Sequence, residues 1–83
     1  MDNPAVRTAV NLALSGKWEE AISANRDILQ TNPEDIEALC RLARAYAETG
    51  QLEEAKNILN KVVGIDPANQ IAVKFLEKLK LAK

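Results

Sequence analysis

Few side chains in this 83-residue sequence could carry chemistry. Histidine is absent and Cys40 is the single cysteine, so the sequence offers no histidine-based acid/base pair, no Ser-His or Cys-His nucleophile and no cysteine cluster for a metal. No glycine-rich phosphate-binding loop is present either. The sequence therefore predicts that the protein is not an enzyme and needs no cofactor or metal.

Two pairs of adjacent carboxylates, Glu19-Glu20 and Glu53-Glu54, come nearest to an acid/base motif. Each pair opens an expected helix, where a negative charge interacts favourably with the helix dipole by ~0.3–1 kcal/mol. We therefore interpret both pairs as helix-stabilising. Cys40 falls inside an expected helix, where a lone cysteine is most often a small packing residue rather than a reactive thiol.

Composition points to one small helical domain spanning residues 1–83. Apolar residues make up 47% and charged residues 28%, with only three glycines, which is typical of a soluble all-α protein. The net charge of −1 gives no general attraction to nucleic acid or to an anionic membrane, and no apolar run approaches the ~20 residues of a membrane span. With one cysteine and no signal-peptide pattern at the start, we expect a cytoplasmic protein. A piece excised from a longer protein would show the same features.

A period of thirty-four residues organises the helices. It relates Pro33 to Pro67 and Gly16 to Gly50, and it also relates several alanines and charged residues: Arg7 to Arg41, Ala9 to Ala43, Ala13 to Ala47, and Glu19-Glu20-Ala21 to Glu53-Glu54-Ala55. One helix-turn-helix per period indicates a helical solenoid, and a solenoid is a binding scaffold.

Apolar periodicity, caps and breakers predict five helices, over about residues 4–15, 17–31, 35–49 and 52–64, and from 70 to the C-terminus. Gly16 and Gly50 allow tight reversals, while Pro33 and Pro67 end the helices before them. Asp35 and Asn69 are expected to cap the third and fifth helices, and Asp2 or Asn3 the first.

The central pattern resembles the tetratricopeptide repeat, and its signature positions are filled by Leu39, Leu42, Ala43, Tyr46, Gly50, Leu52, Ala55 and Pro67. The resemblance implies an all-α, right-handed superhelix of two repeats, over about residues 2–34 and 35–68, closed by a capping helix over about 69–82. It also implies that Ala43 and Ala55 are small because two helices cross there, and that Tyr46 fills the wedge beside the crossing.

Both ends of the chain depart from this pattern. The first repeat has Trp18 in the place of Leu52 and Asn25 in the place of Leu59, which we interpret as a terminal repeat that needs less apolar surface. In the fifth helix Val73 and Leu76 keep the packing positions, but Glu77 stands where Ala43 stands. We therefore expect this helix to cap the solenoid.

In this family the first helix of each repeat lines a concave groove, and the resemblance implies a binding face built from these helices. Its candidate residues are Val6, Arg7, Val10, Glu37, Cys40, Arg41, Arg44, Lys74, Phe75 and Lys78, with Asn3, Ala13, Leu14, Glu48 and Ile71 on the same face. Basic side chains outnumber acidic ones here, so we predict a groove for a short acidic or amphipathic peptide, or for a partner helix. The plainer alternative is a solvated helix face.

Some family members hold a chaperone's C-terminal carboxylate with a clamp of Lys, Asn and Arg side chains. In this sequence Val6, Val10, Arg41, Ile71 and Phe75 stand in those places, so chaperone-tail binding is disfavoured. Two further readings stay open. One is a structural module that forms homo-oligomers through its terminal helices, and the other is a targeting fragment of a longer protein.

Overall fold

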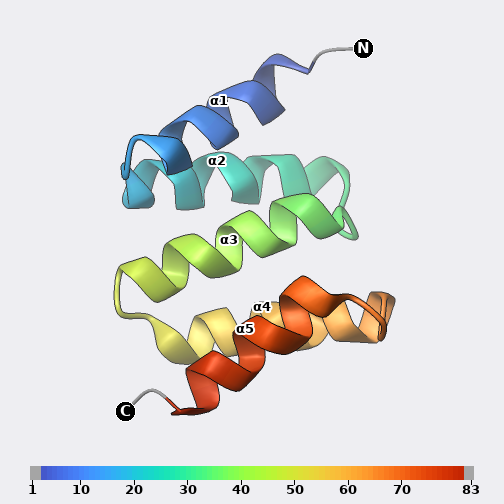
Figure 1. Cartoon of the computed structure of the whole chain (residues 1–83). Coiled ribbons are helices and arrows are strands. Elements are labelled where there is room, and N and C mark those ends of the chain that lie inside the picture. Colours follow the sequence, from blue (N-terminus) through green and yellow to red (C-terminus); the bar gives the residue numbers. More distant parts are fainter. Residues whose placement is uncertain (1–2, 82–83) are drawn as a thin grey trace.

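The computed structural model describes residues 3–81, which fold into five α-helices without a strand in that range (Figure 1). The helices are α1 (Pro4–Leu14), α2 (Trp18–Thr31), α3 (Ile36–Glu48), α4 (Leu52–Ile65) and α5 (Gln70–Leu81). Within residues 3–81 the predicted all-α class and helix positions are confirmed to within a residue or two. The alternative cap at Asp2 and the predicted end of the fifth helix beyond Leu81 lie outside the described residues. The handedness of the superhelix stays a prediction.

Side chains cap three of the five helices at their N-termini, as the sequence predicts. The backbone N–H of Ala5 donates to Oδ1 of Asn3 at 2.9 Å, which opens α1. Oδ1 of Asp35 accepts from the N–H of Ala38 at 3.1 Å, and Oδ1 of Asn69 accepts from the N–H of Ala72 at 2.9 Å. Each carboxylate or amide oxygen satisfies an N–H group that has no partner within its helix.

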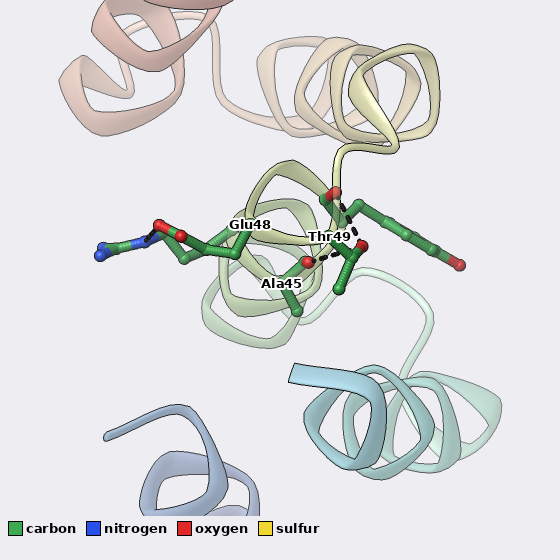
Figure 2. Close-up of polar contacts among 5 residues, drawn as sticks. Ala45, Glu48 and Thr49 are labelled. Atoms are coloured by element: carbon green, nitrogen blue, oxygen red, sulfur yellow. Dashed lines mark hydrogen bonds and ion pairs between the residues drawn. The ribbon is translucent and has the colours of Figure 1, made fainter. Parts of the chain in front are cut away.

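The reversals between paired helices need backbone conformations that glycine alone adopts easily. Gly16 has φ +73° and Gly50 has φ +82°. Before Gly50, the hydroxyl of Thr49 lies 3.1 Å from the carbonyl oxygen of Ala45 and 3.0 Å from that of Tyr46 (Figure 2). These contacts close the last turn of α3 and direct the chain into α4.

The helices stack in chain order, with α3 at the centre (Figure 1). It packs against α2 on one side and α4 on the other, and it also meets α1. Two buried clusters form the core, one around α2 and α3 and one around α3, α4 and α5. Ala43 and Ala55 are completely buried, and Tyr46 packs against both clusters, so the small crossing residues and the aromatic wedge lie where the sequence predicts.

The last helix, α5, lies against α4 and covers the end of the core (Figure 1). Its buried residues are Ala72 and Leu79, whereas Leu76 is half-buried against the core and Val73 lies outside both clusters. The expectation that Val73 takes a core packing position was therefore wrong. The reason is that α5 packs closely against α4 alone among the described helices, whereas α3 packs against both α2 and α4. The position of Val73 therefore lacks the second covering helix that buries its counterpart Leu39. Glu77 is exposed, as expected of a capping helix.

Candidate functional site

Side chains from four helices surround a mainly apolar pocket of about 380 Å³. We call it the apolar pocket. It is lined by Val10, Ala13 and Leu14 of α1, Trp18 of α2, Cys40, Arg41 and Arg44 of α3, and Ile71 and Phe75 of α5.

A second pocket, of about 500 Å³, lies between α3 and α5. We call it the basic pocket, and it is lined by Arg44, Ala47, Glu48, Ile71, Lys74, Phe75 and Lys78. Arg44, Ile71 and Phe75 belong to both pockets, so the two form one continuous groove that crosses α3. One end of the groove is therefore apolar, and the other carries lysines.

Most of the binding residues predicted from the sequence line this groove: Val10, Cys40, Arg41, Arg44, Lys74, Phe75 and Lys78. Val6, Arg7 and Glu37 line neither pocket. Arg7 and Glu37 are exposed and Val6 is half-buried. All three lie in the N-terminal halves of α1 and α3, whereas the groove gathers at the C-terminal half of α1 and the middle and end of α3.

Arg44 stands where the two pockets meet, and it makes two contacts there. Its Nε donates to Oε2 of Glu48 at 3.1 Å, and its Cζ lies 5.7 Å from the centre of the Trp18 ring. Figure 2, which looks along α3, shows Glu48 projecting from the side of α3 on which the blue α1 and red α5 ribbons lie. Because the Arg44 side chain is 61% exposed, this ion pair contributes little to stability.

Arg41 is less accessible than the sequence suggests. It is half-buried, and its Nε donates to Oδ1 of Asn25 in α2 at 2.9 Å. Asn25 is completely buried, and its Nδ2 donates to the carbonyl oxygen of Ala21 at 2.9 Å. We interpreted Asn25 as a sign of a terminal repeat that needs less apolar surface. Instead its polar group has a specific partner, and Arg41 is joined to the interior of the fold.

Cys40 lies half-buried in the wall of the apolar pocket. Burial raises the pKa of its thiol, an effect that nearby Arg41 opposes and Glu37 reinforces. A raised pKa keeps the sulfur protonated at neutral pH, and a protonated thiol is a poor nucleophile. Among residues 3–81 no cluster of acidic or cysteine side chains could hold a metal ion.

The predicted face lacks two residues that line the groove, Trp18 and Ala47, and Trp18 is the larger of the two. In the repeat pattern Trp18 stands in the place of Leu52. It does pack against the core, but it also lines the apolar pocket beneath Arg44. The size of Trp18 could have indicated this role in the sequence. A tryptophan is larger than the leucine at the equivalent position 52, so its ring can extend beyond the contact between its own two helices. Leu14 and Ile71 complete the apolar wall while remaining 81% and 67% exposed.

Within the described range, each helix is too short or too polar to cross a membrane.

Comparison with known proteins identifies the architecture that carries this groove. The family model of the tetratricopeptide repeat matches residues 12–79. Mouse sperm-associated antigen 1 is 32% identical over 63 residues, which cover 76% of this chain and 7% of that protein. The Arabidopsis thaliana peptidyl-prolyl cis-trans isomerase PASTICCINO1 is 28% identical over 65 residues, which cover 78% of this chain and 10% of that protein. The chain thus spans a tenth or less of the length of these relatives. Its match over most of its length shows that the chain belongs to the tetratricopeptide repeat family.

Proposed function

We propose that this chain is a protein-interaction module that binds a short acidic peptide with apolar anchors, or the matching face of a partner helix, in the groove between α1, α3 and α5. Tetratricopeptide repeats generally mediate protein–protein interaction and are typically non-catalytic. The observation that carries the finer proposal is the meeting of basic and exposed apolar side chains in one groove.

The apolar pocket supports a ligand with large apolar side chains. Leu14 and Ile71 are mostly exposed and lie in the same pocket, beside half-buried Trp18 and Phe75. Contiguous exposed apolar residues on a small protein mark an interaction surface more often than scattered ones do. An apolar anchor inserted between α1 and α5 would remove this surface from water.

The charges of the groove support an acidic ligand. Glu48 is its one acidic lining residue among the described positions, and the basic lining residues are Arg41, Arg44, Lys74 and Lys78. The whole chain has a net charge of −1, so the excess of positive charge is local. A charged cleft with apolar walls attracts a ligand of opposite sign and fixes its orientation.

The role within a longer protein would be targeting or assembly. Both curated relatives are much longer than the matched segment, so a module of this kind brings its partner to other domains of the same chain. We place it in the cytoplasm, as the single cysteine suggests.

Charge reversal tests the groove. Arg44→Glu with Lys74→Glu should abolish binding of a short acetylated and amidated peptide of leucine and glutamate, measured by titration calorimetry. Both side chains are exposed and the Arg44–Glu48 ion pair adds little to stability, so circular dichroism should show a nearly unchanged melting curve. Arg41 is left intact because its reversal would also disturb buried Asn25.

The matched control is Arg26→Glu with Lys61→Glu, which makes the same change in net charge at exposed positions on α2 and α4. This control should bind like the wild type. Equal loss of affinity in both double variants would mean that only net charge matters and would contradict a site in the groove.

Self-association through the terminal helices is the second candidate. One observation favours it, because Leu81 at the end of α5 is 82% exposed and lies outside the groove. Light scattering over a concentration series separates the two functions: a constant monomer mass contradicts self-association, and a mass that rises with concentration and falls back in Leu81→Glu supports it.

A further inference from the structure

We infer that Asn25 is a positioning residue that holds the Arg41 guanidinium at the wall of the apolar pocket and so makes the groove select a carboxylate beside an apolar anchor. The inference rests on the proposed function and deepens it. It starts from a buried polar side chain at a position where the next repeat has leucine.

Asn25 occupies a core site that elsewhere in the same chain is apolar. Thirty-four residues later the equivalent position is Leu59, which is also completely buried. The repeat pattern therefore does not require a polar residue at this position, and leucine would bury without a hydrogen-bonding requirement. A buried amide is costly unless its polar atoms are paired.

The two polar atoms of the Asn25 amide form hydrogen bonds in different directions. Asn25 Nδ2 is turned toward the Ala21 carbonyl, which leaves Oδ1 facing α3, where it accepts from Nε of Arg41. Asn25 is the only buried polar side chain among the described residues, and it reaches the one basic residue of the groove that is not exposed. The amide thus links the interior of α2 to the groove wall.

The hydrogen bond from Nε to Asn25 determines which donors of Arg41 remain for a ligand. The guanidinium is planar and carries five N–H donors, so a hydrogen bond from Nε restricts the orientation of the group while leaving its terminal N–H groups for other partners. No hydrogen bond from its terminal nitrogens to another described residue is present, and these nitrogens are available for a carboxylate. Arg41 shares the apolar pocket with Leu14, Ile71 and Phe75, so the carboxylate it would take must lie next to an apolar side chain.

The test replaces Asn25 with leucine and compares two probes. These are short acetylated and amidated peptides of leucine with glutamate and of leucine with glutamine. The wild type should prefer the glutamate peptide, and Asn25→Leu should lose about tenfold of this preference, equivalent to ~1.4 kcal/mol. Binding that depends on leucine should persist. Thermal stability should stay close to that of the wild type, because leucine fills the buried volume and removes the hydrogen-bonding requirement of the amide.

A second readout requires no ligand. In the wild type the Nε–H of Arg41 should give a distinct, slowly exchanging signal in a nitrogen–proton NMR spectrum, assigned by its loss in Arg41→Lys. Asn25→Leu should move this signal to the position and exchange rate of exposed arginines. Asn57→Leu, an exposed change in α4, is the matched control and should alter neither the signal nor the preference.

The possible results distinguish the positioning role of Asn25 from peptide binding in the groove. An unchanged Arg41 signal, or an unchanged glutamate preference in Asn25→Leu, would overturn the positioning role while leaving the groove proposal intact. Failure of both peptides to bind the wild type would overturn the proposed function and this inference with it.

Discussion

At the residue scale, two alanines decide how closely the helices of the central pair approach. Ala43 and Ala55 are completely buried between α3 and α4, where a larger side chain has no room. Ala43→Leu and Ala55→Leu should each lower the free energy of unfolding by roughly 1–3 kcal/mol through overpacking. Urea unfolding measures the change, and Ala5→Leu on the exposed face of α1 serves as the control. A near-neutral effect at both buried positions would contradict the close crossing.

Tyr46 joins the two core clusters, because its half-buried ring packs against both. Tyr46→Ala should cost on the order of 3 kcal/mol or more, since it opens a cavity between clusters that both depend on it. Tyr46→Phe keeps the ring and should unfold at nearly the wild-type urea concentration. If the phenylalanine variant were as unstable as the alanine variant, the hydroxyl group and not the packing would be responsible.

The reactivity of the Cys40 thiol, which depends on its pKa, can be used to detect a ligand in the groove. Burial raises that pKa, so at any pH below it the thiolate fraction is smaller than in an unfolded chain. Iodoacetamide should therefore modify Cys40 more slowly in the folded protein than in urea, and the rate should rise with pH. Because Cys40 lines the apolar pocket, a bound peptide should slow the reaction further. A rate indifferent to saturating peptide would place the ligand elsewhere.

At the element scale, the sequence was sufficient wherever a single residue or a local spacing determines the structure. Asp35 and Asn69 cap helices, Gly50 reverses the chain with positive φ, and Asp66-Pro67 ends α4. The sequence was insufficient where the outcome depends on which helices pack against one another. Val73 is only half-buried because α5 packs closely against α4 alone among the described helices, and no spacing within α5 shows this.

The same dependence on contacts between helices explains why some features of the candidate site were not predicted from the sequence. The bond between Asn25 and Arg41 joins residues sixteen apart in two helices, which does not match the period of thirty-four that organised the prediction. The groove itself could be predicted from the family resemblance, because its residues follow helix faces. The participation of Trp18 and the partial burial of Arg41 depend on side-chain contacts between helices.

The stacking order predicts unequal stability among the helices. α3 is packed on both sides, by α2 and α4, whereas α1 lies at the end of the stack (Figure 1). Backbone amides in the middle of α3 should therefore exchange with solvent more slowly than those of α1, which open by local unfolding. NMR-detected hydrogen exchange measures both helices in one sample. Greater protection of α1 would contradict the central role of α3.

At the scale of the whole molecule, the proposed groove predicts two different dependences on salt. In the proposed complex its basic side chains attract a carboxylate through exposed charges, and salt screens such pairs beyond ~10 Å at about 0.1 M ionic strength. Its apolar wall is indifferent to this screening. Raising salt from roughly 50 to about 500 mM should therefore weaken binding of the leucine–glutamate peptide, because its charge pairs are largely screened at the higher concentration.

The leucine–glutamine peptide isolates the apolar contribution in the same titrations. Its affinity should stay nearly constant with salt, so the two peptides should converge as salt rises. The convergence should be incomplete in the wild type, because Arg41 is half-buried beside Asn25 and is screened less than exposed Arg44 and Lys74. In Asn25→Leu the remaining difference should disappear. A glutamate preference that ignored salt altogether would mean that exposed Arg44, Lys74 and Lys78 take no part, and the search for the acidic subsite would narrow to Arg41 alone.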